Sequence, residues 1–170
     1  MKYIYNNIVE VCSSVSVCFS YVSWVGVVKP RLDQQRHFLP YEYGAIEASC
    51  LTSSLLAIRK FDDFFRDKRN RHDDVIVSDF DYGSCEILTA AERKDINKRV
   101  AHFTTEMESN GKETWAIDDL LKRLSAPLRQ FLEYLLEQCG EEDKGECFEI
   151  SETIKYIDSS LEILSSYGST

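Results

Sequence analysis

Apolar residues recur at helical spacing along most of the chain. The strongest amphipathic pattern begins after Thr114 and runs to about Leu135. Its inward-facing positions are predicted to be Ile117, Leu120, Leu121, Leu124, Leu128, Phe131, Leu132 and Leu135. Similar spacing predicts a helix from Tyr43 to about Phe65 and a last helix from Ser151 to about Ser165. Pro127 is expected to kink the strongest helix, and Gly140 to end it.

The segment from Val11 to Val28 contains no charged residue, and it predicts a first helix that is buried on almost every side. Its serines form one narrow stripe suited to close helix–helix packing, made of Ser13, Ser16, Ser20 and Ser23. The length also fits an alternative, a membrane-anchored helical protein. Serine content and the nearby Glu10 argue against that alternative. Pro30 is expected to end the helix and start a loop.

The tetrapeptide "TAAE", Thr89 to Glu92, has the spacing of a capping box and predicts the start of a third helix. That helix is expected to run from about Ala90 to Glu108. The preceding stretch "RDKRNRHDDVIVSDFDYGS" predicts a surface loop with a brief extended piece. The stretch "GEEDKGE" predicts a solvated turn before the last helix.

About five helices with short or medium connections predict one all-α domain over residues 1–170, an antiparallel helical bundle. The six cysteines form no C-x-x-C pair, and no histidine stands at ligand spacing from them. We therefore expect reduced thiols in a cytoplasmic protein, with no metal site and no cofactor.

The formal net charge is −9, and it is unevenly distributed. Residues 103–170 contain 15 acidic and 6 basic residues, whereas residues 1–102 contain 14 of each. This balance argues against non-specific nucleic-acid binding over a broad surface, which requires a large positive field. A local basic groove remains compatible with it.

The stretch "RKDINKRVAHFTTE" concentrates cations on the predicted third helix. His102 follows Lys98 by four residues and Arg99 by three, so the three side chains share a face. The two cations disfavour protonation of the imidazole, which keeps it available as a general base near a bound phosphate. Arg93 lies in the first turn, where a cation opposes the helix dipole. The other interpretation of this cluster is an ordinary solvated helix face.

The segment "INKRVAHFT", between the aromatic "KFDDFF" helix and the Leu-rich helix, resembles the HEPN superfamily, particularly its abortive-infection branch. The resemblance implies a helical bundle, commonly a homodimer, that acts in phage-defence or toxin–antitoxin systems. Many such proteins are metal-independent ribonucleases, and others are non-catalytic companions of nucleotidyltransferases. The family's signature is an Arg, a polar residue and a later His. Asn97 and His102 match the last two positions, Ile96 occupies the Arg position, and Arg93 or Arg99 is the predicted substitute.

A second stretch, "RDKRNRH", matches the same signature with Arg66 and His72 at its ends. Residues 59–72 and 93–102 each have a net charge of +3, and both are expected to face one groove if their helices pack side by side. The predicted substrate-binding residues are Arg93, Lys98, Arg66, Arg69 and His72. Two hypotheses remain for a soluble protein: an RNA-binding protein with or without cleavage, or a non-catalytic module. The module would form a homodimer or bind a partner antitoxin or nucleotidyltransferase-like protein.

Overall fold

The computed structural model describes residues 2–35, 40–100, 116–140 and 143–167, and within these ranges the regular secondary structure is entirely helical. The predicted all-α class is confirmed. The elements are α1 (Lys2–Cys18), α2 (Ser20–Ser23), a π-helical turn (Trp24–Val28), α3 (Lys29–Gln35), α4 (Pro40–Phe65), a 3-10 helix (Val77–Phe80), α5 (Ala90–Val100), α6 (Ile117–Gln138) and α7 (Lys144–Tyr167).

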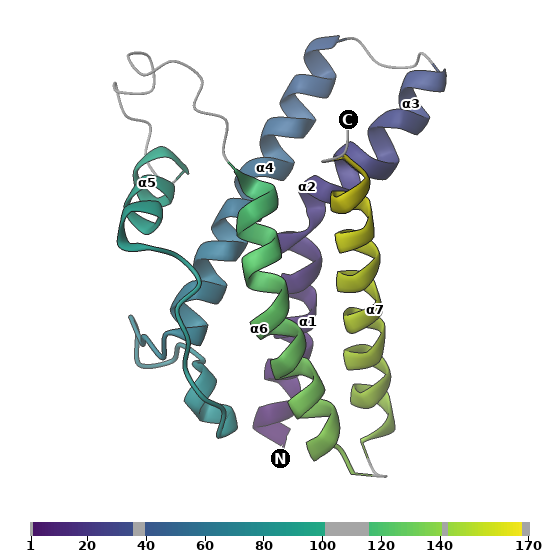
Figure 1. Ribbon diagram of the computed structural model, residues 1–170. Helices are drawn as coiled ribbons and strands as arrows, with labels where there is room; N and C mark the ends of the chain where they lie inside the picture. Colours follow the sequence, from purple (N-terminus) through teal and green to yellow (C-terminus); the bar gives the residue numbers. More distant parts are fainter. Residues whose placement is uncertain (1, 36–39, 101–115, 141–142, 168–170) are drawn as a thin grey trace.

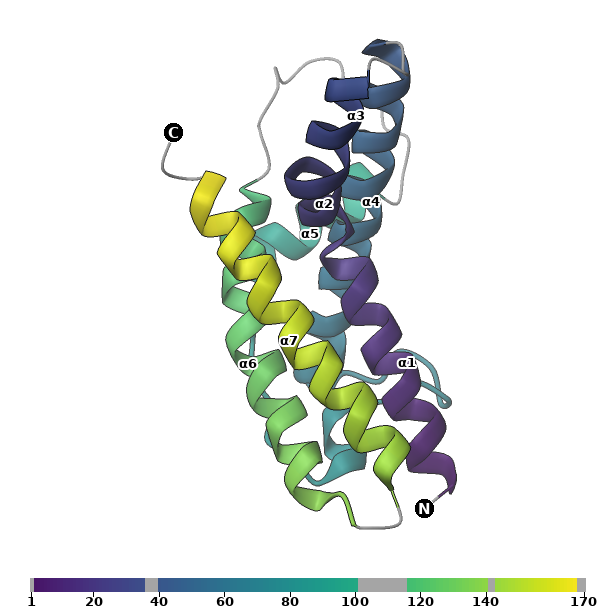
Figure 2. The ribbon, with the colours of Figure 1, turned by 90° about the vertical axis from the view of Figure 1, so that its right-hand side faces the viewer.

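Four long helices lie side by side around one core, in the order α1, α4, α6 and α7 (Figures 1 and 2). The pairs α1/α4 and α6/α7 are antiparallel, as predicted. The pairs α1/α7 and α4/α6 run in the same direction, so the bundle is not antiparallel throughout (Figure 1). The difference arises because the chain returns along the bundle between α4 and α6. Residues 66–100 make part of that return, and they place α5 beside α4.

The N-terminal segment is bent. α1 ends at Cys18, Phe19 departs from regular helical geometry with φ −94° and ψ 9°, and the pieces on either side differ in direction by 46°. In the π-helical turn the N–H of Lys29 donates to the carbonyl of Trp24, five residues back. Pro30 lacks an N–H, but it is the second residue of α3, where a helix tolerates proline. The prediction that Pro30 ends the helix is therefore wrong.

The serine stripe takes part in packing only at its C-terminal end. The hydroxyl of Ser20 lies 3.2 Å from that of Ser54 on α4, and Ser23 lies 2.8 Å from the hydroxyl of Tyr156 on α7. Farther toward the N-terminus the helix has an open side, where Val17 is 45% exposed. The prediction of a first helix buried on almost every side is therefore wrong.

The opposite side of the N-terminal segment packs against α4 and α7. Its buried side chains are Ile8, Val11, Cys12, Val15, Cys18, Phe19, Val22 and Trp24. No described helix is by itself long and apolar enough to span a membrane. The bent pair Asn7–Cys18 and Ser20–Asp33 reaches that length and composition only when its two parts are taken together.

An aromatic cluster joins α4, α6 and the connection that precedes α5. The ring centroid of Phe131 on α6 lies 5.3 Å from that of Phe64, 5.8 Å from that of Phe65 and 5.3 Å from that of Phe80 in the 3-10 helix. The hydroxyl of Tyr134 donates to the carbonyl of Phe80 at 3.1 Å. All eight positions predicted to face inward on α6 are buried. The connection predicted as a surface loop is therefore anchored in the core. Ile76 has extended backbone, as predicted for a brief piece of this loop, and a 3-10 turn follows it.

The ends of α6 and α7 differ from the prediction. α6 continues through Pro127 and ends two residues before Gly140, where Cys139 is extended with ψ 130° and no left-handed glycine is required. α7 begins at Lys144, seven residues before the predicted start. The N–H of Cys147 donates to the carbonyl of Asp143 at 3.0 Å, and the last three residues of the predicted turn are already helical.

Candidate nucleic-acid interface

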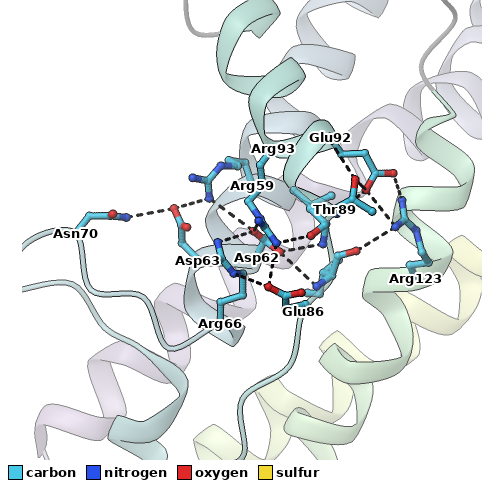
Figure 3. A network of polar contacts seen from close by, with 12 residues as sticks. Arg59, Asp62, Asp63, Arg66, Asn70, Glu86, Thr89, Glu92, Arg93 and Arg123 are labelled. Carbon is cyan, nitrogen blue, oxygen red and sulfur yellow. Dashed lines mark hydrogen bonds and ion pairs between the residues drawn. The ribbon is translucent and has the colours of Figure 1, made fainter.

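The carboxylate of Asp62 joins the end of α4 to the start of α5 (Figure 3). Its side chain is fully buried. Oδ1 accepts the N–H groups of Leu88 at 2.9 Å and Ile87 at 3.3 Å, and Oδ2 lies 2.7 Å from Nε of Arg93. A buried carboxylate requires such donors, because an unpaired charge is strongly disfavoured away from water. The segment that enters α5 is therefore held against α4.

Arg93 has mainly a structural role. Its side chain is 13% exposed, and Nη2 lies 2.5 Å from the carbonyl oxygen of Leu88 and 3.3 Å from the carboxylate of Glu86. Together with Asp62, Glu86 compensates the cost of a cation in the first turn of a helix. Few donors of Arg93 remain for a substrate phosphate, in contrast to its predicted role as a direct substrate contact.

The predicted capping box forms at the start of α5. The N–H of Thr89 donates to Oε2 of Glu92 at 2.8 Å, and the N–H of Glu92 donates to Oγ1 of Thr89 at 3.2 Å. Arg123 on α6 donates to both carboxylate oxygens, at 2.5 Å and 3.3 Å (Figure 3). Because Arg123 and then Thr89 stabilise the charged form, the pKa of Glu92 is lowered to about 2. These bonds tie α5 to α6 as well.

Basic side chains of α4, of the turn that follows it and of α5 line one open hollow of about 560 Å³, here called the basic hollow. Its lining residues are Arg59, Arg66, Lys68, Arg93, Lys94, Asn97 and Lys98. The prediction that the segments 59–72 and 93–102 face one groove is confirmed for these residues. The structure brings four of the predicted site residues together there, namely Arg66, Arg93, Asn97 and Lys98.

The arginines of the basic hollow are paired with acids, and two of its lysines are not. Arg59 lies 2.5 Å from the carboxylate of Asp63, and Arg66 lies 3.3 Å from that of Glu86. Lys68 and Lys94 are exposed and form no ion pair with another described residue. The positive charge open to a ligand therefore comes mostly from the lysines.

Arg69 and His72 lie away from the basic hollow. The guanidinium of Arg69 donates to the carboxylate of Asp79 and to the carbonyl of Asp74, both at 2.7 Å, and so closes the loop onto itself. His72 is exposed in a turn. The chain leaves α4 through Asp67, whose φ of 59° is left-handed. Lys68, the next residue, still lines the basic hollow, whereas Arg69 and His72 do not. Neither residue contributes to the predicted substrate site in this structure.

The predicted catalytic residues are only partly described. Asn97 is exposed and lines the basic hollow. His102 lies outside the described residues, and so does the side chain of Arg99. Ile96, which stands at the position of the family's Arg, is fully buried. The helix therefore directs position 96 into the core and position 97 toward the basic hollow.

Arg59, Lys68 and Lys94 were not among the predicted site residues. Asp62, which holds Arg93 and lies 3.9 Å from Arg59 and Arg66, was not anticipated either. A signal was present in "RKFDDFFR", where Asp62 falls between phenylalanines on the apolar face of the predicted helix. A carboxylate at such a position requires a cationic partner, which marks the packing surface of another basic segment.

The described residues offer cationic and amide groups rather than a metal centre. Among them, no group of three or more His, Cys, Asp or Glu side chains is arranged to hold a metal ion. All six cysteines are free, and burial raises the pKa of Cys18, so its thiol stays protonated.

Comparisons with protein-family models, curated proteins and solved structures found no match. The chemistry that the arrangement supports is the binding of phosphate groups.

Proposed function

We propose that the protein binds RNA at the basic hollow, as a HEPN-like helical module of a phage-defence or toxin–antitoxin system. The observation that supports this proposal is the convergence of six cations and Asn97 from two distant segments on one surface of an otherwise acidic protein. Such a surface suits a polyanionic backbone, because each phosphate that it neutralises releases condensed counterions. The family assignment itself derives from the sequence resemblance.

The charge of the basic hollow limits how many phosphates it neutralises. Its six cations face three nearby acids, Asp62, Asp63 and Glu86, which leaves a net charge of +3. A net charge of this size corresponds to about three phosphate contacts and a slope of log K against log salt of about −2 for single-stranded RNA. RNA binding should therefore be weak at physiological salt unless other contacts add to it.

The described geometry favours binding over cleavage. A cation at the family's Arg position would stabilise a transferring phosphoryl group, but Ile96 provides none and is buried. The catalytic roles of His102 and Arg99 remain predictions. Incubating the protein with RNA and a chelator tests them, and cleavage that disappears in His102→Ala would assign the general base. A nuclease activity unaffected by that substitution would contradict the role of His102.

Charge reversal at the unpaired lysines tests RNA binding. We expect Lys68→Glu/Lys94→Glu to lower the affinity for a fluorescein-labelled RNA at least about tenfold, measured by fluorescence anisotropy at low salt. The matched control is Lys144→Glu/Lys155→Glu, which changes the net charge equally on α7, away from α5 (Figure 1). Equal losses in the two double variants would show that net charge alone acts, and the basic hollow would not be the site.

Formation of the predicted homodimer would affect the basic hollow if the two copies meet at α5. A dimer that buries α5 would either extend the basic hollow with its twofold copy or cover it. Light scattering at several salt concentrations, with and without RNA, distinguishes these cases, because a covered hollow predicts that RNA dissociates the dimer. Binding to a partner antitoxin or nucleotidyltransferase-like protein also remains a prediction.

A further inference from the structure

Two cysteines meet at the end of the bundle where α6 passes into α7 (Figure 2). Cys139 directly follows the last residue of α6, and Cys147 lies in the first turn of α7. Both side chains are half-buried, so a small reagent can reach them from solvent. The other four cysteines lie in α1, in α4 and in the connection that precedes α5.

The backbone of the turn holds these two cysteines close to each other through Asp143. The N–H of Asp143 donates to the carbonyl of Gly140 at 3.1 Å, and its carboxylate accepts the N–H of Gly140 at 3.2 Å. Its carbonyl accepts the N–H of Cys147 at 3.0 Å. Because Cys139 directly precedes Gly140, these bonds through Asp143 connect the positions of the two cysteines.

The side chains of the two cysteines are in contact as well. The thiol of Cys139 is hydrogen-bonded to the thiol of Cys147. Burial, and then this contact, raises the pKa of Cys139, and the negative charges of Asp143 and Glu146 act in the same direction. The thiolate is the form that attacks an oxidant, so Cys139 is a poor first nucleophile. A reaction therefore starts at Cys147, and Cys139 is the neighbour that completes it.

We propose that Cys139 and Cys147 form a dithiol modification site, which hydrogen peroxide oxidises to a disulfide bond across the turn between α6 and α7. In the first step the thiolate of Cys147 attacks one peroxide oxygen, and the O–O bond breaks. Hydroxide leaves and takes up the proton that the thiol released, which gives water and a sulfenic acid at Cys147.

In the second step the sulfur of Cys139 attacks the sulfur of that sulfenic acid. The S–S bond forms, the S–O bond breaks, and the hydroxyl group leaves with the thiol proton of Cys139 as a second molecule of water. The two thiols lose two electrons in total, and one peroxide is reduced to two molecules of water. The disulfide ties the end of α6 to the start of α7 and restricts the unfolded chain, which stabilises the fold. Neither cysteine lines the basic hollow, so this inference does not rest on the proposed RNA binding.

Trypsin provides a direct test, because it cuts after Lys144, between the two cysteines. The full-length protein is treated with hydrogen peroxide, blocked with N-ethylmaleimide in urea, and digested without a reducing agent. We expect peptides 130–144 and 145–155 to stay joined and to separate after addition of dithiothreitol. The number of blocked thiols should fall from six to four, and a non-reducing gel should show a monomer. Separated peptides, or a bond between two chains, would overturn the proposal.

Serine variants identify the residues and the order of the two steps. Cys139→Ser and Cys147→Ser should each abolish the joined peptides. Cys85→Ser is the matched control, because Cys85 is half-buried in a different segment. Dimedone labels sulfenic acids, and it should mark Cys147 in the Cys139→Ser protein. Label on Cys139 in the Cys147→Ser protein, with none on Cys147 in the other variant, would contradict the assigned order.

Urea unfolding tests the effect of the disulfide on stability. Peroxide should raise the unfolding midpoint of the unmodified protein and of Cys85→Ser, and dithiothreitol should reverse the rise. It should raise the midpoint of neither Cys139→Ser nor Cys147→Ser, which separates the disulfide from oxidation elsewhere in the chain. An unchanged or lower midpoint in a protein whose peptides stay joined would contradict the stabilising role of the bond.

Discussion

Replacing Asp62 with alanine tests whether the buried carboxylate holds α5 in place. The substitution removes the 2.7 Å ion pair with Arg93 and leaves the N–H groups of Leu88 and Ile87 without their acceptor. Removing one partner of a buried ion pair costs about 3–5 kcal/mol. Because Arg93 is 13% exposed and keeps other acceptors, we expect the lower part of that range, about 3 kcal/mol.

The loss is measured as the free energy of unfolding in urea, followed by far-ultraviolet circular dichroism at pH 7. A domain of this size has a stability of about 5–15 kcal/mol, so the variant should remain folded at 25 °C with a clearly lower midpoint. Asp62→Asn keeps the shape and one acceptor oxygen, and it should lose only about 1–2 kcal/mol. Asp73→Ala is the control, because Asp73 is exposed and should change stability by less than about 0.5 kcal/mol.

A double-mutant cycle makes this test specific to the pair. If Arg93 is held by Asp62, the Asp62→Ala/Arg93→Met protein should be more stable than the sum of the two single losses predicts, by at least about 1 kcal/mol. A loss below about 1 kcal/mol for Asp62→Ala, with an unchanged denaturant slope, would refute the structural role assigned to Arg93.

Three further predictions concern acid stability, packing and thiol reactivity. The pKa of Glu92 is about 2 when folded and about 4.5 when unfolded, so its stabilisation is present above pH 4.5 and is lost as the pH falls toward 2. Glu92 and Arg123 are 30% and 41% exposed, so we discount this to about 1 kcal/mol. In urea titrations Glu92→Gln should lose that amount at pH 7, and the loss should shrink as the pH falls through 2. Phe131→Ala, at the centre of the aromatic cluster, should lower the free energy of unfolding by about 3–5 kcal/mol, whereas Phe148→Ala, at a 63% exposed site, should change it by less than about 0.5 kcal/mol in the same urea assay. Burial raises the pKa of Cys18, and its thiol should react with Ellman's reagent only on unfolding; fast native-state labelling identified by mass spectrometry would contradict its burial.

Features set by local sequence were predicted correctly. The capping box at Thr89 forms with both expected hydrogen bonds, because its partners are three residues apart and need no other element. The inward face of α6 was correct because its spacing is unbroken over five turns. Errors occurred where tertiary packing extends a helix beyond its local signals. α3 includes Pro30 because a π-helical turn precedes it, and α7 begins at Lys144 although the local sequence resembles a turn.

The candidate site was only partly predictable for the same reason. The grouping of Arg66, Asn97 and Lys98 in one hollow was anticipated from charge and helix order. The sequence did not indicate which cations are paired with acids and which are not. That division depends on contacts between distant segments, such as the contact of Asp62 on α4 with Arg93 on α5. Motif matching also gave His72 as a second candidate, which does not line the basic hollow, since a linear pattern contains no information about the path of the loop after α4.

Arginines and lysines contribute differently to the basic hollow, and this difference makes stability and RNA binding separable. The planar guanidinium groups of Arg59, Arg66 and Arg93 match carboxylates, and each is paired with an acid. Arg59 is paired with Asp63 within α4, Arg66 with Glu86 of the segment that enters α5, and Arg93 of α5 with Asp62 of α4. Lys68 and Lys94 are hydrated point charges at the open side, where exchanging counterions for phosphates costs no internal contact. Substitutions of the arginines should therefore lower the unfolding midpoint together with RNA affinity. Substitutions of the two lysines should lower RNA affinity and its salt dependence while the midpoint stays unchanged.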